Sequence, residues 1–187
     1  MWEIQAGFNF AVKELEGHNL RPAHKLYLAR RYGIPAWIPM VVRVLLRTSF
    51  DSYTHDDHVN MGFDTFARIA IGKEVISHIR RKLAFVPPYP HSLDEAPHCT
   101  DPESCKRVWA EHWAMEMIPH IHHPVVHFPL SKCLDTLRAM NHKGMHMVCK
   151  TYILDWMEMS CPGLEKEEKA IRQVIKDIQD DTYMQWF

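Results

Sequence analysis

Apolar residues recur at helical spacing along this chain, and this periodicity constrains its fold more than any other feature. The last segment shows it best, with apolar residues at i, i+3, i+4 and i+7: Ile171, Val174, Ile175 and Ile178. The same spacing occurs at Leu130, Cys133, Leu134 and Leu137. Such spacing places the side chains on one face of an α-helix, and no segment alternates as a β-strand would. The sequence therefore predicts an all-α fold, an irregular array of about eight helices.

Glycine and proline residues separate the predicted helices. In the first part of the 187-residue chain, helices are expected over residues 3–16, 23–32, 35–47 and 64–83. The proline-rich segment 86–102 cannot continue a helix. It is therefore the predicted connection within a single helical region, between a first half (1–85) and a second half (103–187). Asp101 is the predicted N-cap of the next helix, with Pro102 at its first position.

Composition and charge limit the classes of protein to which this chain can belong. The net charge is −1, and 24% of the residues are charged, so no strong field points to nucleic acid or to a membrane. No run approaches ~18 consecutive apolar residues, and no membrane span is expected. The five cysteines are an odd number, and the N-terminus lacks a secretory signal. These features favour a reducing intracellular compartment, the cytoplasm or the nucleus, over a secreted disulfide framework.

Two short-spaced pairs of soft ligands form a candidate metal site. They are Cys99 with Cys105, and His146 with Cys149. Structural zinc commonly takes four such ligands as two pairs, although Cys99 and Cys105 are further apart than the usual ~2–4 intervening residues. Alternatively, Cys149 is a reduced core side chain, because it shares an apolar face with Tyr152 and Trp156. The predicted cofactor is one structural zinc ion, held by Cys99, Cys105, His146 and Cys149.

A histidine-rich stretch offers an alternative, enzymatic interpretation. Pro119 to Pro129 is expected to be irregular and contains four histidines: His120, His122, His123 and His127. His120, His122 and His123 could hold a catalytic metal, with Glu111 or Glu116 as the base. However, this pattern differs from the helical His-Glu-x-x-His arrangement, and the chain has neither a Gly-x-Ser-x-Gly elbow nor a phosphate-binding glycine loop. The leading prediction is that the chain is not an enzyme, and a metal-dependent enzyme using residues 120–127 is the alternative.

Two further groups of residues are assigned structural roles. Trp109 and Trp113 share an apolar face and are expected to anchor the second half against the last helix. The basic run Arg80-Arg81-Lys82 is expected at a solvated helix end, where cations complement the helix dipole.

Residues 25–38, KLYLARRYGIPAWI, resemble a segment that follows the BTB domain in BTB/POZ-domain proteins of mushroom-forming (basidiomycete) fungi. There the segment reads roughly L-x-L-A-R-K-Y-x-V-x-x-W. Later features match in the same order: a Cys-x5-Cys loop, a Trp-rich helix, the step His123-Pro124, a Gly-Met-x-x-x-Cys turn and a Glu-rich final helix. The resemblance runs from about Trp2 to Gln179. The BTB domain itself is absent from this sequence, and His146 stands where the family often has cysteine.

The resemblance implies a function without catalysis. BTB proteins dimerise through the domain that is absent here and use appended modules to present partners. The chain is accordingly expected to be a protein–protein interaction module, a scaffold or adaptor. Its partners would be proteins, with neither nucleic acid nor membrane among them.

Overall fold

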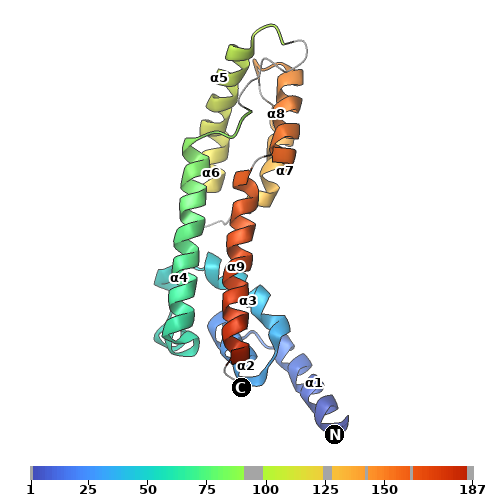
Figure 1. Cartoon of the computed structure of the whole chain (residues 1–187), viewed down its shortest axis with the longest axis vertical. Coiled ribbons are helices and arrows are strands. Elements are labelled where there is room, and N and C mark those ends of the chain that lie inside the picture. Colours follow the sequence, from blue (N-terminus) through green and yellow to red (C-terminus); the bar gives the residue numbers. More distant parts are fainter. Residues whose placement is uncertain (1, 91–98, 124–127, 142, 161, 185–187) are drawn as a thin grey trace. The chain divides into compact units, whose positions relative to one another are not determined.

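The computed structural model describes residues 2–90, 99–123, 128–141, 143–160 and 162–184, and every regular element in these ranges is helical (Figure 1). The prediction of an all-α fold with about eight helices is confirmed. No helix in the described ranges combines the length and the apolar character needed to cross a membrane.

The α-helices follow one another along the chain, and segments 86–101 and 122–129 are the longer connections. Their bounds are α1 (Trp2–Gly17), α2 (Pro22–Tyr32), α3 (Ile38–Arg47), α4 (His55–Phe85), α5 (Pro102–His112), α6 (Ile118–Ile121), α7 (Cys133–Ala139), α8 (Met147–Ser160) and α9 (Pro162–Met184). Short 3₁₀ turns cover Pro35–Trp37, Phe50–Ser52 and Leu130–Lys132, and a π-helical turn covers Trp113–Met117.

The chain packs as two compact units. Unit 1 contains Met1–Gly72 and Arg172–Phe187, and unit 2 contains Lys73–Ile171. The boundaries therefore fall within α4 and α9, whereas the sequence placed the division at residues 86–102. The prolines do end α4, but the segment after it packs into unit 2, where Pro88 and Pro90 are buried. Proline stops a helix because it lacks an N–H and clashes with the preceding turn, which does not by itself separate two cores.

Glycine and capping residues define the helices of unit 1. Gly33 adopts a left-handed conformation with φ of 65° and ends α2, as predicted. The predicted helix 64–83 corresponds to the part of α4 that follows Gly62, where φ is 69° and ψ is 166° and the helix is interrupted. An earlier helical stretch of α4 begins at His55. Thr54 and Asp57 cap this start reciprocally. The Thr54 N–H donates to Asp57 Oδ2 at 2.9 Å, and the Asp57 N–H donates to Thr54 Oγ1 at 3.3 Å.

The core of unit 2 surrounds two tryptophans. Trp109 and Trp113 are each 1% exposed, as their predicted role in a core requires. Trp109 Nε1 donates to the Pro88 carbonyl at 3.0 Å, and Trp113 Nε1 donates to the Leu83 carbonyl at 3.0 Å. Their polar contacts thus run to the end of α4 and the segment after it, rather than to the last helix. From α9, Leu164 packs against the same core.

Two expectations about unit 2 need correction. The helix runs through Pro119 to Ile121 by way of the π-helical turn, so the irregular stretch begins at His122 and not at Pro119. Arg80 is not solvated. Its side chain is buried and pairs with Glu167 of α9.

Candidate metal centre

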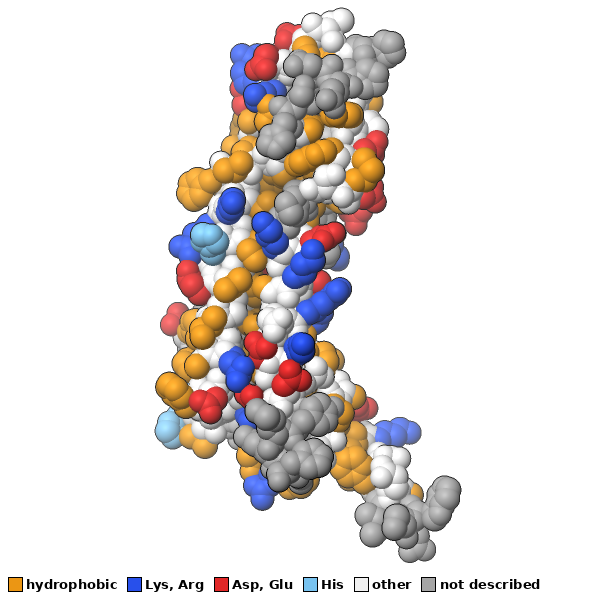
Figure 2. All heavy atoms as spheres, viewed as in Figure 1, with side chains coloured by type: hydrophobic (Ala, Val, Ile, Leu, Met, Phe, Trp, Pro, Cys, Tyr) orange, Lys and Arg blue, Asp and Glu red, His pale blue; other side chains and the backbone are white. Residues whose placement is uncertain are grey.

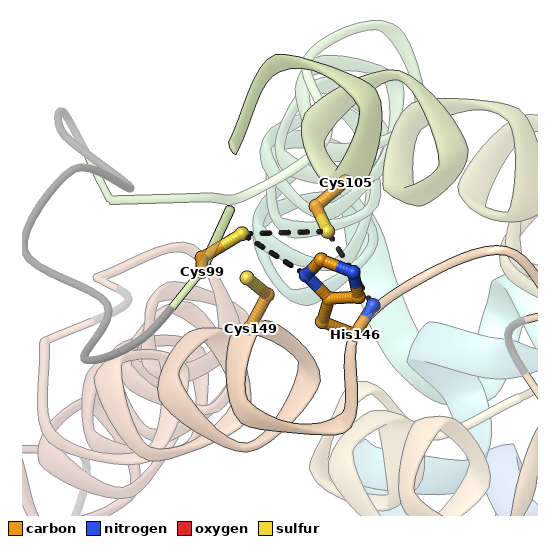
Figure 3. A group of neighbouring side chains, drawn as sticks. All are labelled: Cys99, Cys105, His146 and Cys149. Atoms are coloured by element: carbon orange, nitrogen blue, oxygen red, sulfur yellow. Dashed lines mark hydrogen bonds between the residues drawn. The ribbon is translucent and has the colours of Figure 1, made fainter. Parts of the chain in front are cut away.

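Three segments of unit 2 bring the four predicted ligands together. Cys99 precedes α5, Cys105 lies in the first turns of α5, and His146 and Cys149 flank the start of α8. Figure 3 shows their side chains pointing toward one another from these segments. Because Cys99 and His146 are 47 residues apart in sequence, the cluster depends on the packing of α5 against the start of α8.

Local geometry fixes the two ends of the site. The Asp101 carboxylate accepts the Ser104 N–H at 3.1 Å, which confirms the predicted N-cap and sets where α5 begins. On the other side, Gly144 has φ of 87°, a left-handed conformation that turns the chain just before His146. The His146 N–H then donates to Cys105 Sγ at 3.4 Å. Such main-chain hydrogen bonds orient the ligands of metal sites.

The distances fit a tetrahedral zinc ion. One donor atom from each residue lies within 4.8 Å of all the others. Cys99 Sγ lies 3.8 Å from Cys105 Sγ and 3.3 Å from His146 Nδ1. Zinc–ligand bonds of ~2.3 Å to sulfur and ~2.0–2.1 Å to nitrogen imply S···S and S···N edges of about 3.8 and 3.6 Å. The cysteines are not in disulfides, whose sulfurs would be ~2.05 Å apart.

The site lies at the edge of the core. Cys105 and Cys149 are buried, Cys99 is partly buried and His146 is exposed. Met145 packs against the same core, and Val108 lies beside the Gly144 turn. A cation can therefore enter from the histidine side while two of its ligands are held by surrounding apolar side chains.

The thiols titrate differently. Hydrogen bonds from the Cys149 thiol, from His146, from the Asp101 N–H and from Cys105 lower the pKa of Cys99 to about 7. Burial raises the pKa of Cys149 well above the ordinary value for a thiol. Zinc binds cysteine as the thiolate, so its binding would release the protons that these thiols carry.

The histidine-rich stretch does not form a second site among the described residues. There the cluster of Cys99, Cys105, His146 and Cys149 is the single group with metal-binding proximity. His120 stacks on Phe128 with ring centroids 5.5 Å apart, while His122 and His123 are exposed. His127 lies outside the described residues. The histidines that can be placed therefore lack the convergence that the enzymatic alternative requires.

Sequence reasoning thus found all four cluster residues and missed others. Cys133 was correctly assigned to the core, because it is fully buried and outside the cluster. The polar contacts of Arg80 and Glu167 and the arginine pocket described below were missed, because neither has a sequence motif. No family model, curated protein or solved structure matches this chain.

Proposed function

We propose that this chain is a non-enzymatic helical module for protein–protein interaction, stabilised by one structural zinc ion. The observation that carries the proposal is the convergence of three cysteine sulfurs and one imidazole nitrogen within 4.8 Å. This is the Cys3His ligand set of structural zinc sites.

The donor set selects both the metal and its role. Calcium and magnesium prefer oxygen ligands, whereas thiolates and imidazole suit zinc. Four protein ligands fill the tetrahedral coordination sphere, so no position is left open for a catalytic water or a substrate. This favours a structural ion over the metal-dependent enzyme.

The zinc would hold together parts of unit 2 that have few apolar side chains of their own. Cys99 lies near the end of the proline-rich segment 86–102, and His146 belongs to an exposed turn. Ordering such segments costs conformational entropy, which the metal–ligand bonds offset. Because zinc binds the folded arrangement, its binding free energy adds to the free energy of unfolding.

The surface supports a protein partner. Phe63 and Ile71 lie two helical turns apart on α4, with 84% and 66% of their surface exposed. Aromatic residues such as Phe63 are enriched at protein interfaces. On the face that Figure 2 draws, apolar side chains are exposed among charges of both signs. The resemblance to the region after the fungal BTB domain favours a scaffold or adaptor.

Zinc content tests the metal part of this proposal. Protein purified without an affinity-tag metal should contain about one zinc per chain. Cys99→Ser should abolish that zinc and increase cleavage by protease near the proline-rich segment. Cys133→Ala is the matched control, since it removes a buried thiol outside the cluster and should retain zinc. A metal-free wild-type protein would refute the site.

Affinity capture tests the interaction part. The zinc-loaded chain should retain a defined protein, identified by mass spectrometry, that binds directly when purified. Replacing Phe63 and Ile71 by Glu should weaken this binding, while Phe10→Glu, which alters an exposed aromatic residue on α1, should not. Failure to retain any direct binder would contradict the interaction role and leave the zinc result standing.

A further inference from the structure

Unit 1 contains a pocket that neither the zinc site nor the interaction surface explains. Its volume is about 470 Å³, and it lies between α2 and the interruption of α4 at Gly62. Its lining includes two arginines of α2, Arg30 and Arg31, and residues Asn60 to Gly62 of α4. The volume falls in the range of ~300–1,000 Å³ that is typical of small-ligand sites.

The lining is cationic and rich in hydrogen-bond donors. Besides the two guanidinium groups it includes Tyr27 and Asn60, and none of the described residues that line it is acidic. Val59 and Met61 add apolar surface. A ligand with an anionic group and an apolar part would match these walls.

Arg30 is held in place without a counterion. Its Nη1 donates to Thr65 Oγ1 at 2.6 Å and to the Met61 carbonyl at 3.4 Å. Its Nε is buried and has no hydrogen-bond partner among the described residues. An unsatisfied buried donor of a charged group is costly, and an anion beside this guanidinium would stabilise its charge.

Arg31 adds a second, exposed positive charge. Its Nη1 donates to the Tyr27 hydroxyl, and the guanidinium lies over the Tyr27 ring at 5.7 Å from the centroid. No carboxylate in the described ranges pairs with Arg30 or Arg31. By contrast, Arg21 and Arg68 of the same unit pair with Asp57 and Asp181.

We propose that this pocket binds a small ligand bearing an oxyanion, a phosphate or a carboxylate. Guanidinium groups present parallel N–H donors that match the oxygens of both anions. Arg30 is positioned by Thr65 and Met61, and Arg31 by Tyr27. Neither arginine therefore has to be reoriented from a competing ion pair when an anion enters.

Isothermal titration of the full zinc-loaded chain tests this, with inorganic phosphate in one arm and citrate in the other. Saturable binding of either anion is expected, and the stronger of the two identifies the class of oxyanion. Arg31→Gln should weaken binding about tenfold or more, since hydrogen bonds to charged groups contribute about 1.5–3 kcal/mol. Arg47→Gln, an exposed arginine outside the pocket, should leave it unchanged.

A second variant protects the test against misfolding. Arg30→Lys keeps the charge and loses the planar fork, so it should weaken anion binding while the helical circular-dichroism signal is retained. Absence of saturable binding of both anions, or equal loss in the Arg31 and Arg47 variants, would overturn the proposal. Cys99→Ser should still bind the anion, which separates this inference from the zinc proposal.

Discussion

The buried side chain of Arg80 donates several hydrogen bonds within unit 2. Its Nε and Nη2 donate to Glu167 Oε1 at 3.0 and 2.7 Å, and Nη1 and Nη2 also donate to the carbonyls of Ile121 and Phe128. One guanidinium thereby joins α4, α6, α9 and the segment before the Leu130 turn. Both charged side chains are at most 10% exposed. Because little water reaches them, the ion pair stabilises each charge in place of water.

Removing one partner of this pair should therefore be costly. Arg80→Ala should lower the free energy of unfolding by about 3–5 kcal/mol, because the buried Glu167 carboxylate loses its guanidinium partner. Urea denaturation of zinc-loaded protein measures this. The control is Arg81→Ala, whose pair with Glu74 is at least half exposed and should cost less than about 1 kcal/mol. Equal decreases in the free energy of unfolding in the two variants would show that the buried pair contributes no more to stability than the exposed pair.

Asp57 is a buried carboxylate of unit 1, and it makes the stability of this unit depend on pH. Hydrogen bonds from Arg21, then from the N–H and hydroxyl of Thr54, hold the pKa of Asp57 well below its usual range. A carboxyl whose pKa is lower in the folded than in the unfolded state stabilises the fold above its unfolded pKa of ~3.9. That stabilisation is lost as the pH falls through this value towards the folded pKa.

Acid titration of stability should reveal this carboxyl. The free energy of unfolding should decrease below a pH of about 4, and Asp57→Asn should make this decrease smaller. Asp51, which is exposed, provides the control as Asp51→Asn. Identical acid profiles for the Asp57 variant and wild type would contradict the assignment.

At the level of elements, local signals predicted a helix where they were strong and complete. Asp101 and Pro102 predicted the start of α5, and Gly33 predicted the end of α2. The stretch of α4 before Gly62 lay outside the predicted helix 64–83, because its cap uses Asp57 where the usual box has Glu or Gln, and because Gly62 interrupts the apolar period. The continuation through Pro119 was missed because it depends on a π-helical turn, which the 3.6-residue period does not describe.

Trp109 of α5 offers a test of the core packing of unit 2. Trp109→Ala should lower the free energy of unfolding by about 3–5 kcal/mol through lost packing, with the hydrogen bond to the Pro88 carbonyl also lost. Phe85→Ala is the control, since that ring is 83% exposed and surface substitutions usually change stability by less than about 0.5 kcal/mol. A denaturation midpoint unchanged by Trp109→Ala would mean that the ring is not part of the core.

At the scale of the whole molecule, the residue types of the metal site were predictable and their convergence was not. Each pair is close in sequence, and thiols with imidazole point to zinc wherever they meet. That the two pairs meet depends on contacts between α5 and α8, which helical periodicity does not determine. The pocket of Arg30 and Arg31 has no motif, because its cationic character comes from the missing counterion and not from the residue types alone.

X-ray absorption at the zinc edge of the purified chain tests the central claim most directly. Three sulfur atoms at about 2.3 Å and one nitrogen at about 2.0–2.1 Å are expected in the first coordination shell. His146→Ala should replace that nitrogen or release the metal, while His122→Ala, at an exposed histidine outside the cluster, should leave the shell unchanged. A shell with fewer than three sulfur atoms, or a chain that binds no zinc, would contradict the account.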